Sequence, residues 1–99
     1  MEKIKTTLIG AGYRGKQLLQ FLQNFPFFEV MAVADPYIEE TDIPEIVCYN
    51  NGEEDYLNML DRHKPELVFI TSPWQCHVRH AIQCVERRCH VALEIKGGL

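Results

Sequence analysis

Residues 3–15 read Lys3-Ile4-Lys5-Thr6-Thr7-Leu8-Ile9-Gly10-Ala11-Gly12-Tyr13-Arg14-Gly15, which predicts a short strand, a tight turn and the beginning of a helix. The glycines have the spacing Gly10-x-Gly12-x-x-Gly15. In a dinucleotide-binding turn, the first glycine allows the tight turn and the second lets a pyrophosphate reach the backbone. The third lets the helix lie close to the strand. The N–H groups at the helix start then attract the phosphates.

Glycine-rich turns are common, but the sequence on both sides of this one supports the motif. Leu8 and Ile9 lead into the turn as an apolar strand, and apolar positions then recur on one helical face at Gly15, Leu18, Leu19 and Leu22. A second apolar strand, residues 27–34, ends at Asp35, and an acidic residue is expected about 20 residues after the glycines. We therefore predict dinucleotide binding. The alternative is a plain structural turn in another α/β protein.

The position of Asp35 predicts which dinucleotide binds. A carboxylate there accepts hydrogen bonds from both ribose hydroxyls and repels a 2′-phosphate, so NAD is favoured over NADP. Pro36 and Tyr37 follow, and neither is a cation that could hold that phosphate. The alternative for Asp35 is a strand-end turn. Arg14 either touches the pyrophosphate or is solvated, and Trp74 lies either beside the cofactor or in a surface contact.

The remaining sequence alternates strands with helices. Strands are predicted at residues 3–9, 27–34, 45–49, 67–71 and 89–95, and helices at 13–24, after the acidic run 53–55 and after Pro73. This alternation predicts a Rossmann-like three-layer α/β domain with a parallel sheet in the order 3-2-1-4-5. Residues 36–44 are too few for the crossover of about a dozen residues that is usual, so the second crossover helix should be shortened or absent. The ligand crevice then lies at the carboxyl ends of strands one and four.

The last predicted helix carries two readable patterns. Residues 72–75, Ser-Pro-Trp-Gln, resemble a capping box with proline at the first helical position. Behind it, one helical face is apolar and consists of Val78, Ala81, Ile82 and Val85. Cys76, His80 and Cys84 share another face. No tight pair of the kind that zinc sites use is present, so we interpret these cysteines as small buried hydrophobes and predict no metal site.

Composition restricts the class of protein further. The chain has 99 residues, enough for one domain, and its formal net charge of −4 disfavours a nucleic-acid partner. No apolar run approaches the roughly 20 residues of a membrane span. A strand beginning at residue 3 leaves no room for a signal peptide, so we expect a cytoplasmic protein with reduced cysteines. The fifth strand would be an apolar sheet edge, which favours a homo-oligomer.

The chain also resembles the glucose–fructose oxidoreductase and inositol dehydrogenase family (Gfo/Idh/MocA) over essentially its whole length. Residues 9–15 are similar to the family's opening, residues 71–77 to its Thr-Pro-Asn-x-x-His loop, and residues 90–96 to its Lys-His-Val-x-x-Glu-Lys-Pro run. The resemblance implies that residues 1–99 are an NAD(P)-binding Rossmann domain. Family members have a second, C-terminal domain that binds sugars, polyols or related substrates, and it is not present here. This chain alone is therefore expected to bind a nucleotide and to catalyse nothing.

The resemblance also implies site residues. Cofactor binding falls to Gly10, Ala11, Gly12, Tyr13, Arg14, Asp35, Ser72, Pro73, Trp74, His77 and Glu94. Lys96 is the candidate catalytic residue, one position later than the family lysine because Ile95 intervenes. Successive residues of a strand point to opposite faces, so this shift changes the direction expected for the lysine. Trp74 replaces the family's asparagine and exchanges a hydrogen bond for a stacking surface.

Three functions follow as hypotheses. The first is the nucleotide-binding domain of an NAD-dependent oxidoreductase that transfers hydride to or from a hydroxyl-bearing carbon of a sugar-like substrate. The second is an NAD-dependent glycoside hydrolase of the same family, in which a transient oxidation permits cleavage. The third is a non-catalytic NAD-binding regulatory module, which the shifted Lys96 and the missing second domain favour.

Overall fold

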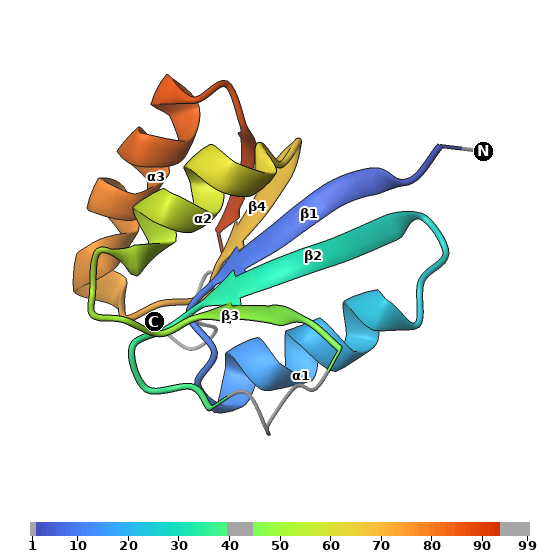
Figure 1. The fold of residues 1–99 in the computed structure, drawn as a ribbon, viewed down its shortest axis with the longest axis horizontal. Coiled ribbons are helices and arrows are strands. Elements are labelled where there is room, and N and C mark those ends of the chain that lie inside the picture. Colours follow the sequence, from blue (N-terminus) through green and yellow to red (C-terminus); the bar gives the residue numbers. More distant parts are fainter. Residues whose placement is uncertain (1, 40–44, 94–99) are drawn as a thin grey trace.

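A computed structural model describes residues 2–39 and 45–93 as a parallel sheet between two layers of helix (Figure 1). The sheet has the order β3-β2-β1-β4-β5, which confirms the predicted topology. Its strands are β1 (Ile4–Ile9), β2 (Phe28–Ala34), β3 (Val47–Tyr49), β4 (Leu67–Ile70) and β5 (His90–Leu93). One face is covered by α1 (Tyr13–Gln23), and the other by α2 (Asp55–His63) and α3 (His77–Glu86). No helix in these ranges is both long and apolar enough to cross a membrane.

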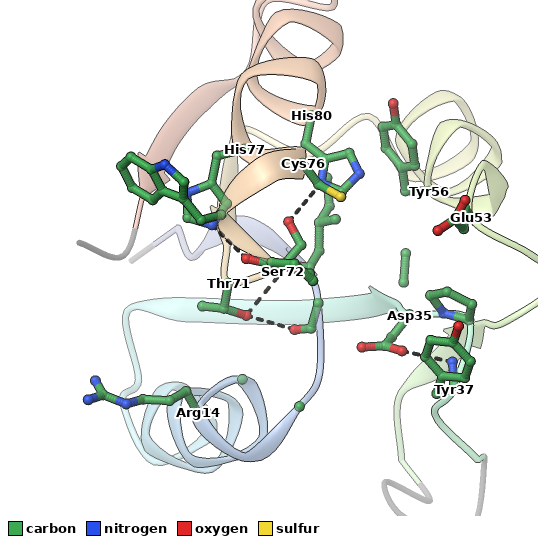
Figure 2. Close-up of a pocket in the computed structure, with 18 of the residues that line it drawn as sticks. Arg14, Asp35, Tyr37, Glu53, Tyr56, Thr71, Ser72, Cys76, His77 and His80 are labelled. Carbon is green, nitrogen blue, oxygen red and sulfur yellow. Dashed lines mark hydrogen bonds between the residues drawn. The ribbon is translucent and has the colours of Figure 1, made fainter. Parts of the chain in front are cut away.

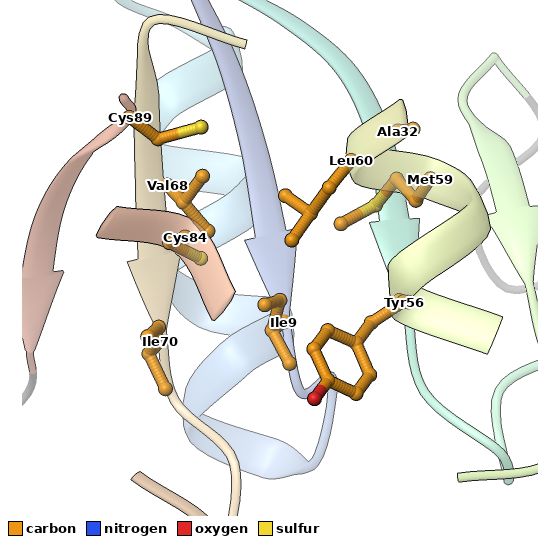
Figure 3. Packing of buried hydrophobic residues seen from close by; sticks show 10 residues of the cluster. Ile9, Ala32, Tyr56, Met59, Leu60, Val68, Ile70, Cys84 and Cys89 are labelled. Atoms are coloured by element: carbon orange, nitrogen blue, oxygen red, sulfur yellow. The ribbon is translucent and has the colours of Figure 1, made fainter. Parts of the chain in front are cut away.

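The central strand β1 supplies the core on both faces of the sheet. Successive strand residues point to opposite sides, so Leu8 packs with Leu19 and Leu22 of α1 while Ile9 faces the opposite layer. Figure 3 shows the second cluster, in which Ile9 lies with Met59 of α2 and other buried residues. The predicted inner face of α1 is confirmed, because its buried residues are Gly15, Leu19 and Leu22. The turn between β1 and α1 is thus held by core packing on both sides.

The connection between β2 and β3 is short, as expected. No helix is present in residues 35–39 or 45–46, and β3 begins at Val47, two residues later than predicted. Ile38 and Ile46 instead bury their side chains in the cluster around Leu8, at 3% and 7% exposure. These two isoleucines cover part of the sheet face that a crossover helix would otherwise cover.

The apolar face predicted for the last helix is largely not the buried one. Val78, Ile82 and Val85 are 70%, 51% and 63% exposed. The buried residues of α3 are His77, His80 and Cys84. His80 contacts Ser72 and Tyr56, and Cys84 packs in the core cluster that contains Ile9. These contacts bury this face of α3, and the spacing of apolar residues does not reveal them.

The predicted capping box is wrong. A 3₁₀ turn, η2 (Trp74–Cys76), precedes α3, and neither element has a side-chain cap. The Ser72 hydroxyl is instead hydrogen-bonded to His80, with 2.8 Å between Oγ and Nδ1. The Ser72 hydroxyl thus bonds to His80, eight residues along the chain, and not to the N–H groups at the start of the helix.

All four cysteines are free thiols, and Cys84 and Cys89 are buried in the core beneath α2 and α3. Burial raises the pKa of Cys84 to about 12, so this thiol stays protonated and unreactive at neutral pH. In the part of the chain that the structure describes, no group of three or more His, Cys, Asp or Glu residues is placed to hold a metal ion.

Two threonines on β1 give a matched test of buried hydroxyls. Thr6 and Thr7 are both fully buried, but Thr6 donates to the Ile4 carbonyl at 2.9 Å, whereas Thr7 Oγ1 has no hydrogen-bond partner among the described residues. Thr7→Val should therefore raise the free energy of unfolding by about 1 kcal/mol, because it removes an unsatisfied polar group. Thr6→Val should leave it unchanged or lower it. Urea unfolding measures both, and equal destabilisation by the two variants would contradict the expectation.

Candidate functional site

A cavity of about 500 Å³ opens at the carboxyl edge of the sheet, between the glycine turn, the end of β2 and the loop after β4 (Figure 2). It lies where the strand order reverses between β1 and β4, as predicted for a ligand crevice. The predicted site residues that line it are Gly10, Gly12, Tyr13, Arg14, Asp35, Ser72, Pro73, Trp74 and His77. Ala11 reaches the site through its N–H group. Glu94 and Lys96 lie outside the described residues.

The three glycines of the turn meet different surroundings. Gly10 has a φ of +98°, and a Cβ there would lie 2.4 Å from the Ser72 nitrogen. A Cβ on Gly15 would lie 2.5 Å from the Gly10 carbonyl oxygen. A Cβ on Gly12 would meet nothing within 4 Å. Gly10 and Gly15 therefore permit close packing of the chain on itself, while Gly12 keeps backbone open to the cavity at the start of α1. This combination fits a bound pyrophosphate.

Thr71, which was not among the predicted site residues, holds the turn against β4. Its hydroxyl donates to the Gly10 carbonyl at 2.7 Å, and its N–H donates to the Ile9 carbonyl at 2.8 Å. The sequence does carry a weak signal for it, since a threonine ends an otherwise apolar strand immediately before Ser72. The glycine turn thus takes its shape from a residue 61 positions away.

The Asp35 carboxylate joins the glycine turn to the end of β2. Oδ2 accepts the Ala11 N–H at 2.6 Å, and Oδ1 accepts the Tyr37 N–H at 2.8 Å. The strand-end turn considered for Asp35 is therefore present. A carboxylate oxygen has two lone pairs and can accept a second hydrogen bond, so both oxygens retain capacity for a ligand's hydroxyls. Asp35 also lines the cavity, which makes the two roles compatible.

Two histidines of α3 converge on Ser72. Nε2 of His77 donates to the Ser72 carbonyl at 2.6 Å, while His80 Nδ1 lies 2.8 Å from the Ser72 hydroxyl. The His80 ring packs against Tyr56 of α2, with ring centroids 4.4 Å apart. Burial, then the nearby charges of Arg79 and His77, lowers the pKa of His80 to about 4, so its imidazole is neutral at physiological pH. His80 lines the cavity but was not predicted as a site residue.

The aromatic residues at the rim are more exposed than the rest of the lining. Trp74 is 59% exposed, with its indole 5.2 Å from the His77 ring between centroids, and Tyr13 is 78% exposed. Tyr13 accepts a hydrogen bond from Gln17, one turn along α1. Trp74 therefore lines the cavity with a largely exposed indole, and a place beside the cofactor stays a prediction.

The parallel sheet, the open glycine at a helix N-terminus and the acidic end of β2 together define a dinucleotide-binding domain of the Rossmann type. The sequence model described as "Oxidoreductase family, NAD-binding Rossmann fold" matches residues 4–95, so the chain belongs to the Gfo/Idh/MocA family.

Curated relatives match the chain at low identity. A glycosyl hydrolase family 109 protein of Saccharopolyspora erythraea is 26% identical over 107 residues, covering 98% of this chain and 23% of that protein. A similar protein of Bacteroides fragilis is 23% identical over 109 residues, covering 100% of this chain and 24% of the relative. The chain thus spans about a quarter of the length of these curated relatives.

Solved structures of inositol dehydrogenases have the same fold. The myo-inositol 2-dehydrogenase of Lactobacillus plantarum matches with a TM-score of 0.80 at 18% identity, over 93% of this chain and 28% of that one. The myo-inositol dehydrogenase of Corynebacterium glutamicum matches with a TM-score of 0.78 at 23% identity, over 93% and 28% of the two chains. At these identities the likeness concerns the fold alone.

Proposed function

We propose that this domain binds NAD in preference to NADP and orients it for hydride exchange with a hydroxyl-bearing carbon of a sugar or polyol. The observation that carries the proposal is the pairing of Gly12, whose missing side chain leaves the turn open, with the Asp35 carboxylate beside it. Together they match the two ends of an adenosine diphosphate group: pyrophosphate on backbone N–H groups, and ribose hydroxyls on a carboxylate.

Each part of the site has a defined task in this proposal. The N-terminus of α1 holds the pyrophosphate, and Asp35 accepts the ribose hydroxyls while its negative charge repels a 2′-phosphate. Ser72, Pro73 and Trp74, which follow β4, supply a further part of the cavity lining. When bound, the nicotinamide supplies or accepts the hydride. We assign Glu94 and Lys96 to the reacting end by their resemblance to the family's run at that point.

A titration with reduced cofactors tests the preference. Trp74 is the only tryptophan, and its emission overlaps the absorption of reduced nicotinamide, so binding should produce saturable energy transfer. We expect NADH to bind at least about tenfold more tightly than NADPH, a difference of about 1.4 kcal/mol. Equal affinities would contradict the role of Asp35 in selection, and absence of both transfer and heat on mixing would contradict the cofactor site itself.

A glycoside hydrolase is the second candidate for a whole protein with this domain. The observation in its favour is that the relatives described above are named glycosyl hydrolase family 109 proteins. The two candidates differ in whether NAD is consumed. In a protein that carries this domain together with a substrate domain, glycoside cleavage without net accumulation of NADH would support the hydrolase. Accumulation of NADH in step with product would support the dehydrogenase.

A further inference from the structure

We propose that His80 recognises the adenine base of the cofactor through its Nε2 atom, bonding the N1/N6 edge of the base. The inference rests on the proposed function, because it assumes that Asp35 binds the adenosine ribose. It adds a specificity-determining residue that lies on a different element from the glycine turn and from Asp35.

The position of the base follows from the position of the ribose. Besides the glycine turn and Asp35, the cavity is lined by Tyr37, Glu53, Tyr56 and His80. Figure 2 shows the His80 ring, on α3, between Ser72 and Tyr56, both of which it contacts. We place the base of a ribose bound at Asp35 among these residues. The N1/N6 edge is the part of adenine farthest from the sugar, so it is the edge that we place toward His80.

The His80 ring is held in one orientation. Its Nδ1 lies 2.8 Å from the Ser72 hydroxyl, its edge packs on Tyr56, and the residue is only 4% exposed. Two contacts from different elements therefore determine where the second ring nitrogen points. A group prearranged in this way loses little conformational freedom when a ligand binds.

The second ring nitrogen is available for a ligand. In residues 2–39 and 45–93, no group forms a hydrogen bond with His80 Nε2, although the residue lines the cavity. A neutral imidazole has one donor and one acceptor nitrogen, and the Ser72 hydroxyl can either donate to Nδ1 or accept from it. Nε2 can therefore donate to adenine N1 or accept from the N6 amino group. Both partners lie on the same edge of the base.

Two substitutions separate the base contact from the Ser72 contact. His80→Asn places an amide where Nδ1 now lies, so it retains a partner for Ser72 and loses the group at Nε2. His80→Gln places its amide near Nε2 instead.

Three ligands test the base contact. The first is NAD. The second is nicotinamide 1,N6-ethenoadenine dinucleotide, in which an etheno bridge blocks N1 and N6, and the third is nicotinamide mononucleotide, which has no adenine. Calorimetric titration of the three ligands into the wild-type chain and both variants measures the affinities.

We expect the wild-type chain and His80→Gln to bind NAD about tenfold more tightly than the etheno analogue. His80→Asn should bind NAD and the etheno analogue with equal affinity. Its affinity should be lower than that of the wild-type chain for NAD but unchanged for the analogue. Affinity for nicotinamide mononucleotide should be the same in all three proteins. Undiminished discrimination in His80→Asn, or equal losses for every ligand, would overturn the inference while leaving the cofactor site intact. Failure of the wild-type chain to bind NAD at all would overturn the proposed function and this inference with it. Urea unfolding of each variant identifies a loss caused by misfolding.

Discussion

Replacing Gly10 with alanine should lower the free energy of unfolding by about 3 kcal/mol or more. The backbone there has a φ of +98°, which strains any residue with a Cβ. The added Cβ would also lie 2.4 Å from the Ser72 nitrogen and 2.7 Å from the Thr71 carbonyl carbon. These neighbours are backbone atoms at the end of a buried strand, so they cannot rotate away. Urea unfolding followed by circular dichroism measures the loss.

Gly12→Ala is the matched control, because it adds the same methyl group two residues away in the same turn. Gly12 has a φ of −68° as the N-cap of α1, and its Cβ would enter open space. Stability should change by less than about 1 kcal/mol, since glycine and alanine differ modestly at that position. Affinity for NADH should nevertheless fall, because the methyl group occupies the place proposed for the pyrophosphate. Equal stability of the two variants would mean that the turn is not packed on β4 as described.

Asp35→Ala should weaken NADH binding by about 100-fold, a loss of about 2.7 kcal/mol, measured by energy transfer from Trp74. Two effects add. The ribose hydroxyls lose a charged acceptor, and the Ala11 and Tyr37 N–H groups lose the carboxylate that orients them. The preference for NADH over NADPH should disappear in the same variant, because the charge that repels a 2′-phosphate is gone.

Asp61→Ala provides the control for charge. Asp61 also bears one negative charge, but it is exposed and paired with Arg87 at 2.7 Å on the helices, and it does not line the cavity. Because Asp61 does not line the cavity, its removal should leave the affinities for NADH and NADPH unchanged. The fold should also be retained, since an exposed ion pair contributes little to stability. If Asp61→Ala weakened NADH binding as much as Asp35→Ala, the effect would come from net charge and not from a specific contact.

The sheet order and the glycine turn could be predicted from sequence because their signals are local. Apolar runs such as 67–70 identify buried strands, the spacing of Gly10, Gly12 and Gly15 predicts a phosphate-binding turn, and right-handed connections then determine the order. The sequence also predicts why glycine is needed at Gly10, for a tight turn, and at Gly15, for close packing of the helix. Both agree with the structure, where a side chain at either position would collide with backbone.

The orientation of α3 and the contacts of Ser72 could not be predicted in the same way. Val78, Ile82 and Val85 are more apolar than the histidines that are buried in their place, so periodicity indicated the wrong face. His80 is buried because Ser72 and Tyr56, from two other segments, provide a hydrogen bond and a ring contact. Such partners become neighbours only when the chain folds, and no local pattern encodes them. For Thr71 the sequence carries only the weak signal of a threonine at the end of an apolar strand, and its partner Gly10 likewise becomes a neighbour only on folding.

The central place of β1 has a consequence for the order of events on the ribosome. β1 precedes both of its partners, β2 and β4, in the chain, and its glycine turn is held by Thr71. A nascent chain that ends before residue 67 therefore lacks one neighbour of its central strand and the support of its nucleotide site. The contacts with β4 and Thr71 can form only after residues 67–71 have emerged, so we expect the cofactor to be bound only by a chain whose second half is available for folding. Nucleotide binding would thus report completion of the fold during translation.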